Sequence, residues 1–177
     1  MFISEIEREV QRVEQSMLAL AGRLDPDGIP ASEAPRLFER LDRVVRTATA
    51  ARTLVARRVE DSTAWQRRGF HNAAEYLAAT SGTSLSAARN ELDTSRAIEA
   101  LPGVREAMVD GTLSAPQAAV IADAAKANPG AAAGLLAAAT KTNLRELREE
   151  AGRVKAAADA DPMATHARIH RTRRLPR

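Results

Sequence analysis

Apolar residues follow helical spacing through most of the chain. Over the first two dozen residues they recur alternately three and four positions apart, which is a heptad seam sustained for three repeats. We call it the first seam; its members are Ile3, Ile6, Val10, Val13, Met17, Leu20 and Leu24. Pro26, Gly28 and Pro30 then interrupt the pattern, because proline lacks an amide donor and glycine tolerates a turn. The spacing predicts a helix over residues 4–22.

A second, longer helix is predicted after this break, from Ser32 as its N-cap to about Ala64. Its apolar positions form a second seam, made of Leu37, Leu41, Val44, Ala48, Ala51 and Val55 and flanked by Phe38, Val45 and Val59. This wider face favours packing in a helical bundle. We therefore expect residues 1–68 to form a long antiparallel hairpin. Pairing or exchange of these helices between two copies is an alternative that the pattern leaves open.

Beyond Gly69 the pattern changes to short helices with clear boundaries. The predicted N-caps are Asn72, Ser84 or Thr83, Ser114 and Asn143, the last in a capping box with Glu146. Gly82, Gly111 and the sequence Asn128-Pro129-Gly130 are predicted to end helices. We expect a compact multi-helix domain over residues 69–158 and a basic C-terminal tail over residues 159–177.

No segment alternates apolar and polar residues over the length of a strand, so the predicted fold class is all-α. The core must be mainly aliphatic, because the only aromatic residues are Phe2, Phe38, Trp65, Phe70 and Tyr76. The chain has no cysteine, which excludes disulfides and thiol catalysis. It shows neither a signal peptide nor a membrane span, so we expect a cytoplasmic protein without a membrane partner.

Basic residues are distributed unevenly. Residues 36–68 hold nine arginines against four acids, and residues 163–177 hold five arginines and no acid. Arginine can bind phosphates through two parallel hydrogen bonds, although a bias in genome composition would produce the same excess. The arginines taken as candidate nucleic-acid ligands from these stretches are Arg57, Arg58, Arg67, Arg68, Arg171, Arg173 and Arg174. The alternative is an ordinary solvated helix face.

Residues 73–98 have the outline of a helix-turn-helix. Ala78 lies four residues before Gly82, where the first helix needs a small side chain, and Leu77, Leu85 and Ala88 would fill the angle between the helices. The second helix would then present Arg89, Asn90 and Arg96 to nucleic acid. Three acidic residues on the same helix oppose this reading, and a helix pair that serves only packing is the alternative.

A similar outline recurs over residues 104–125, where Gln117 could read an adenine edge. A capped core helix is the favoured interpretation of that segment.

No catalytic constellation is present. His71 lacks an acidic or nucleophilic partner, and His166 and His170 have helical ligand spacing without a third ligand. We therefore expect no catalytic residue, no metal, no cofactor and no small-molecule substrate. The chain is not expected to be an enzyme.

A sequence resemblance adds a biological setting. Residues 69–118 carry Ala73-Ala-Glu-Tyr-Leu-Ala, Gly82-Thr-Ser with Ala88-Arg89, Leu101-Pro102, and Gly111-Thr-Leu-Ser before Gln117-Ala118. In order and spacing they resemble the actinobacterial 13E12-repeat family, which carries domain-of-unknown-function family 222. In that family the helical region usually precedes an HNH endonuclease module, which implies DNA association and often a mobile-element setting. The HNH module is absent from this sequence.

Two functions follow as expectations. The first is a nucleic-acid-associated helical module, the non-catalytic half of a nuclease-type protein, in which the two arginine-rich stretches form one positive face. The second is a protein-interaction or dimerisation module built on the two seams, with no role in binding nucleic acid.

Overall fold

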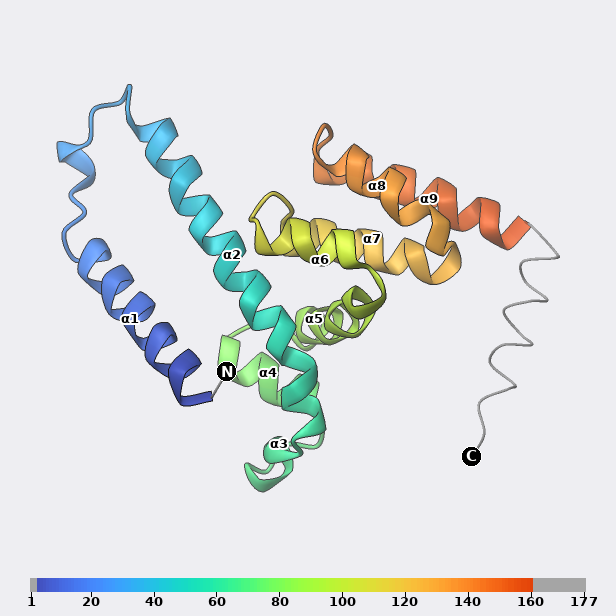
Figure 1. Cartoon of the computed structure of the whole chain (residues 1–177), viewed down its shortest axis with the longest axis horizontal. Coiled ribbons are helices and arrows are strands. Elements are labelled where there is room, and N and C mark those ends of the chain that lie inside the picture. The colour runs from blue at the N-terminus through green and yellow to red at the C-terminus, as the bar shows by residue number, and fades with distance from the viewer. Residues whose placement is uncertain (1–2, 161–177) are drawn as a thin grey trace. The chain divides into compact units, whose positions relative to one another are not determined.

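The computed structural model describes residues 3–160, and this part of the chain is all-α (Figure 1). Its α-helices are α1 (Ile3–Ala21), α2 (Ala34–Asp61), α3 (Ala64–Arg67), α4 (Ala73–Ser81), α5 (Leu85–Ala97), α6 (Pro102–Val109), α7 (Ala115–Ala127), α8 (Ala132–Ala139) and α9 (Leu144–Ala160). Short 3₁₀ helices occupy Pro26–Gly28, Ile98–Ala100 and Pro129–Ala131. The predicted fold class is confirmed. The arginine-rich tail and His166 and His170 lie outside the described residues.

The chain divides between Leu41 and Asp42 into two compact units. This division differs from the expected boundary at residues 68 and 69, because the second half of α2 packs into the larger unit. In the smaller unit, no residue of α1 is buried. Both long helices are present, and the packing of their seams against each other in a hairpin stays a prediction.

Helix α7 forms the centre of the larger unit. It contacts α5, α6, α8 and α9, and Ala118, Ile121 and Ala124 on it are fully enclosed. The largest buried side chains around it come from neighbouring segments; they are Ile98, Met108, Leu113, Leu135 and Leu147. Small alanines on α7 allow neighbouring helices to approach closely while larger aliphatic side chains fill the space between them.

The side of α2 that faces the larger unit is not the side carrying the second seam. Its buried residues are Ala50, Thr53 and Ala56. Val44 and Val55 of the second seam remain 38% and 56% exposed. Helix α2 therefore packs mainly through small side chains, with Leu54 beside them, and leaves Val44 and Val55 exposed.

The predicted caps of the short helices and of α9 are confirmed, whereas α2, for which Ser32 was the predicted cap, begins at Ala34. The side chains of Asn72, Ser84 and Ser114 accept hydrogen bonds from backbone amides in the first turns of α4, α5 and α7. Asn143 and Glu146 form a reciprocal capping box at the start of α9, at 3.0 and 3.1 Å. These contacts satisfy amide donors that have no partner within the helix.

A second hydrophobic cluster joins α2, α4 and α5 around Ala56, Ala73, Ala74, Ala88 and Leu92. Leu77, Ala78 and Leu85 pack against it, together with Trp65. The residues expected to fill the angle between the two helices at the Gly82 turn therefore do share one cluster. This packing accounts for them without any role in groove binding.

Two turn glycines offer a test of how closely α2 packs on the larger unit. Gly82 and Gly111 both have left-handed backbones, with φ of 62° and 70°. A Cβ at Gly111 would lie 3.0 Å from side-chain carbons of Arg43 and Thr47 on α2, whereas one at Gly82 would meet nothing within 4 Å. We expect Gly82→Ala to lower the free energy of unfolding by about 1–2 kcal/mol. Gly111→Ala should cost about 1–3 kcal/mol more, because the added methyl group overpacks this contact.

Urea denaturation of both variants would measure the difference, with Gly134→Ala as the matched control. Gly134 lies in α8 with open space around it, so alanine there should stabilise the protein by about 0.5–1 kcal/mol. Equal losses at Gly82 and Gly111 would contradict the close packing of α2 on the α6–α7 turn.

Candidate functional site

Three of the candidate nucleic-acid arginines are bonded to carboxylates. Arg57 pairs with Glu99, and Arg58 lies 3.2 Å from Asp61. Arg96 bonds both Glu60, at 3.1 Å from its Nε, and Asp93, at 2.8 Å. The hydrogen bond with Glu60, and then the negative charge of Glu60 and Asp93, raise the pKa of Arg96 above its usual value. Arg57 and Arg96 thus connect helices within the larger unit, whereas Arg58 and Asp61 both lie on α2; all three arginines have a carboxylate partner that offsets their charge locally.

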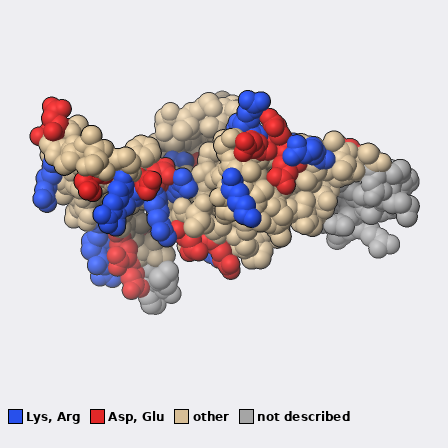
Figure 2. Space-filling view, turned by 90° about the horizontal axis from the view of Figure 1, so that it is seen from above, with Lys and Arg blue, Asp and Glu red and all other residues tan. Residues whose placement is uncertain are grey.

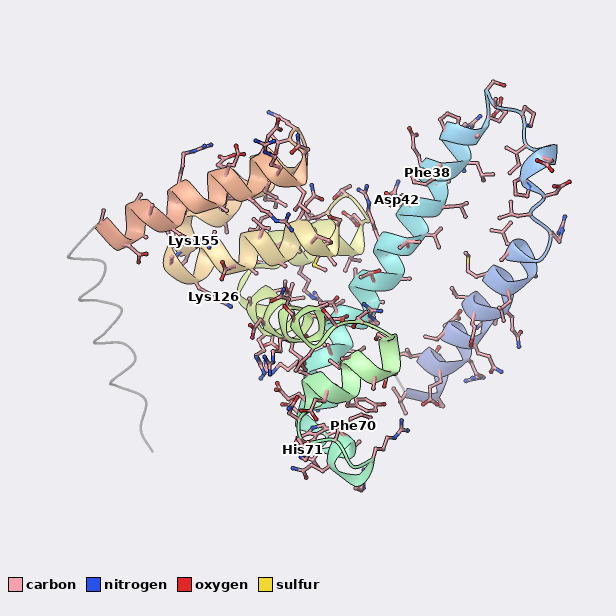
Figure 3. The ribbon with its side chains drawn as sticks, turned by 180° about the vertical axis from the view of Figure 1, so that it is seen from behind. Phe38, Asp42, Phe70, His71, Lys126 and Lys155 are labelled. Carbon is pink, nitrogen blue, oxygen red and sulfur yellow. The ribbon has the colours of Figure 1, made fainter. Side chains whose placement is uncertain are left out.

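Arg68 is held by an aromatic side chain. Its guanidinium group lies 5.4 Å from the centre of the Tyr76 ring and donates a hydrogen bond of 3.2 Å to the phenol oxygen. Phe70 meets the same ring edge-on, with 5.5 Å between ring centres. Arg68 thus fixes the loop before α4, where Phe70 and His71 lie (Figure 3).

Arg67 and Arg89 are different, because none of the ion pairs within residues 3–160 involves either side chain. Arg67 ends α3, and Arg89 lies exposed on α5. The remaining candidates, Arg171, Arg173 and Arg174, lie outside the described residues. Of the arginines expected to bind phosphate, the described part of the chain leaves these two without a carboxylate or aromatic partner.

The distribution of charge on the surface agrees with this pairing. On the face drawn in Figure 2, basic and acidic side chains are interspersed. Ion pairs of the larger unit include Arg46 with Asp42, Arg52 with Glu91 and Lys155 with Asp123. The hydrogen bond from Lys155 to Asp123, together with the negative charge of Asp123, raises the pKa of Lys155. The face drawn in Figure 2 is thus mixed in charge.

Gln117, through its side chain, and His71, through its backbone amide, form hydrogen bonds that hold neighbouring segments of the fold together. The Gln117 amide donates to the carbonyl of Ala139 at 2.9 Å, and its oxygen accepts from the amide of Ser114 at 3.0 Å. The backbone amide of His71 donates to the carboxylate of Glu75 at 3.1 Å. The expectation of a capped core helix at Gln117 is confirmed, and both the nitrogen and the oxygen of its side chain are already engaged.

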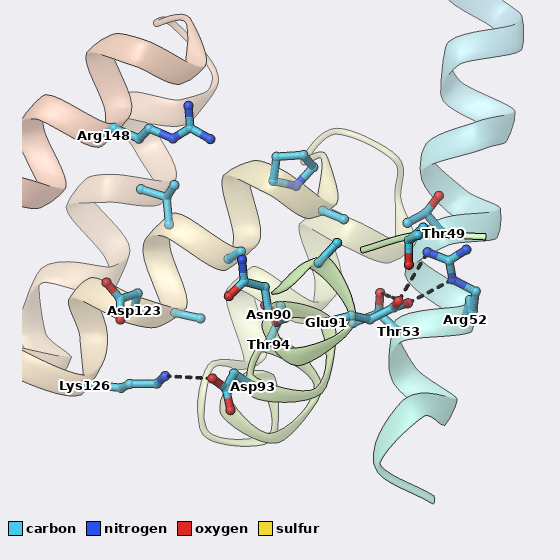
Figure 4. Close-up of a pocket in the computed structure, with 17 residues that line it drawn as sticks. Thr49, Arg52, Thr53, Asn90, Glu91, Asp93, Thr94, Asp123, Lys126 and Arg148 are labelled. Atoms are coloured by element: carbon cyan, nitrogen blue, oxygen red, sulfur yellow. Dashed lines mark hydrogen bonds and ion pairs between the residues drawn. The ribbon is translucent and has the colours of Figure 1, made fainter. Parts of the chain in front are cut away.

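A cavity of about 490 Å³ opens between α2, α5, α7 and α9 (Figure 4). Three carboxylates line it, and each has a basic partner: Glu91 bonds Arg52 at 2.9 Å, Asp93 lies 3.9 Å from Lys126, and Asp123 bonds Lys155 at 2.9 Å. All three carboxylates thus take part in ion pairs that join neighbouring helices, and we assign the cavity no chemistry.

Residues 3–160 contain no cluster of three or more histidine or acidic side chains that could hold a metal ion. None of the helices in this range combines the length and the apolar character that crossing a membrane requires.

The clearest unexplained feature is apolar and lies on the two long helices. On α1 and the residues just after it, every large aliphatic side chain except Met17 is at least 39% exposed; these are Ile3, Ile6, Val10, Val13, Leu18, Leu20 and Leu24. Phe38, on the first half of α2, is 72% exposed (Figure 3). The heptad spacing identified these positions except Leu18, and named Phe38 as a flank of the second seam, but the expected hairpin would have covered them.

Comparison with known proteins gives no relative: no protein-family model matches the chain, and neither a curated protein nor a solved structure matches it. The resemblance to the 13E12-repeat family stays a prediction that depends on the residues quoted above. The function must therefore be argued from the described surfaces.

The bond between α2 and α5 can be tested by mutation. Glu91 is only 14% exposed and accepts from Arg52 and, at 3.4 Å, from the Thr53 hydroxyl. We expect Glu91→Gln to lower the free energy of unfolding by about 1–2 kcal/mol, because the charge-assisted bonds are weakened where water replaces them poorly. Glu149→Gln is the matched control: Glu149 pairs with Arg145 on the exposed face of α9, and its loss should cost less than about 0.5 kcal/mol. Thermal or urea unfolding that shows equal effects would rule out a structural role for Glu91.

Proposed function

We propose that this chain is a protein-interaction module whose docking surface is formed by the apolar seams of α1 and α2. The observation that carries the proposal is the exposure of the first seam along the whole of α1, a helix of 19 residues with no buried side chain. Contiguous apolar surface of this kind on a helix is typical of a site that binds another helix.

Helix energetics support the proposal. An isolated helix of this length is only marginally stable in water, because most of the stability of a protein helix comes from packing its apolar face. Burying one Val, Leu or Ile side chain completely contributes about 1.5–3 kcal/mol. A partner that covered several half-exposed positions, such as Val10 and Val13, would therefore stabilise both α1 and the complex.

The second seam supports the same function. Val44 and Val55 stay exposed on the outside of α2, while Ala50, Thr53 and Ala56 fix the opposite side of the helix to the larger unit. The second seam is therefore held on a supported helix. A docking surface on a rigid element loses little conformational entropy when it binds.

Association with nucleic acid is a second candidate. Its support is the pair of arginines without carboxylate partners, Arg67 and Arg89, together with the resemblance to a family in which the helical region often precedes a nuclease module. Arg89 and Asn90 are adjacent and exposed on α5, the second helix of the pair joined by Gly82. The neutralised charge of Arg57, Arg58 and Arg96 makes this the weaker of the two candidates.

The interaction function predicts self-association or partner binding that depends on α1. We expect Val10→Asp to raise the dissociation constant by roughly 100-fold or more, because a carboxylate would be placed in an apolar interface without a partner. Light scattering or sedimentation equilibrium over a range of concentrations would measure it. Gln15→Asp, on the opposite side of α1, adds the same charge and should leave association unchanged. A parent chain that is strictly monomeric, and that stays so with candidate partners, would remove the proposal.

The nucleic-acid candidate predicts binding that falls steeply with salt. In fluorescence anisotropy with duplex DNA, we expect measurable affinity near 50 mM salt and a large drop in affinity near 200 mM salt. Replacing Arg67 and Arg89 together by glutamine should weaken binding and reduce the salt slope by about one for each phosphate that is no longer neutralised. Arg145→Gln, at an exposed arginine that already has a carboxylate partner, is the control. No binding at low salt, or an affinity independent of salt, would exclude this candidate.

A further inference from the structure

We infer that the partner of α1 is a second copy of this chain, and that the first seam of one copy docks on the second seam of the other, with each copy giving and receiving one helix. The inference rests on the proposed function, since it names the partner of that same surface. Three observations carry it: the matching spacing of the seams, their opposite charge, and the exposure of both.

The seams match when the two helices run antiparallel. The spacings from Met17 back to Ile3 are four, three, four and three residues, and those from Leu37 forward to Ala51 are the same. Five layers result, in which the two residue numbers of each pair add to the same total: Met17 with Leu37, Val13 with Leu41, Val10 with Val44, Ile6 with Ala48 and Ile3 with Ala51. Large side chains face small ones at one end of the seam, which allows close approach of the helices.

The distribution of charge favours pairing of α1 with α2 over pairing of α1 with a second α1. Helix α1 carries four glutamates and two arginines, whereas residues 34–55 of α2 carry five arginines and two acids. Two parallel copies of α1 would place Glu9 of one opposite Glu14 of the other on the edge of the seam. Like charges at these edge positions oppose pairing, and opposite net charges favour it.

Most positions of the two seams are exposed in each unit taken by itself. In the smaller unit α1 buries no residue, although Met17, Leu37 and Leu41 are half-buried; in the larger unit Val44 is 38% exposed, and Ala48 and Ala51 are exposed. The connection contains Pro26 and Pro30 and a 3₁₀ turn capped by Asp25. Because one chain carries both halves of a complementary pair, a two-fold axis covers all four seams at once, so association stops at the dimer.

The absence of cysteine permits a direct test. Val10→Cys and Val44→Cys would be prepared as separate chains with different mass tags, unfolded together in urea, refolded and oxidised. We expect a disulfide-linked heterodimer in the mixture. It should exceed by at least about tenfold the product of a control mixture of Gln15→Cys with Val44→Cys, because a disulfide needs Cα atoms within about 7 Å.

Each other outcome has a separate meaning. A linked homodimer from Val10→Cys alone would show that α1 pairs with α1; it would overturn this inference and leave the proposed function in place. A chain carrying both cysteines that forms a bond within itself, with no heterodimer from the mixture, would show a hairpin within one copy and would also overturn the inference. No linked product, combined with a monomeric parent chain in light scattering, would overturn the inference. The proposed function would fall with it only if the chain also stayed monomeric with candidate partners.

Discussion

Close packing of α2 against the larger unit is the interaction on which the rest of the structure depends. It requires small side chains at Ala50, Thr53 and Ala56, and a turn at Gly111 that has no Cβ to separate the α6–α7 connection from α2. A helix has only one side available for a given neighbour. Because the small residues occupy that side, the larger apolar residues of the second seam must face elsewhere. The exposed seam is thus a consequence of how the compact unit is built.

The same packing brings several arginines of the larger unit against carboxylates. Arg52, Arg57 and Glu60 emerge from α2 beside α5, where they meet Glu91, Glu99 and Arg96. Such cross-helix pairs orient α5 relative to α2 while they cancel charge that would attract a polyanion. A chain that used these arginines mainly to bind phosphate would leave them without carboxylates at this junction. The ion pairs therefore favour an architectural role for Arg52 and Arg57 on α2.

The sequence predicted local features well, because these depend on neighbouring residues. The caps at Asn72, Ser84 and Ser114 occur where predicted, since a short polar side chain before a helix has few other ways to satisfy the first amides. Which side of α2 would be buried was not predictable from the same reasoning. The second seam is the more hydrophobic side, yet the alanine and threonine side is the one that α5 and the Gly111 turn can approach.

The candidate site was also only partly predictable, because the partners that neutralise Arg57 and Arg96 include Glu99 and Glu60, more than thirty residues away along the chain. A count of charges within a segment cannot include such partners.

The exposure of two apolar seams restricts the functions that this fold can have. An apolar helix face that stays exposed in a folded protein is an aggregation hazard unless a specific partner covers it. A partner other than a second copy would have to match the spacing and charge of α1 independently. A second copy already carries the matching seam on α2, because residues 37–51 repeat the spacing of residues 3–17 in reverse order. Pairing between identical chains therefore needs no further surface than the one that the fold of α2 leaves exposed.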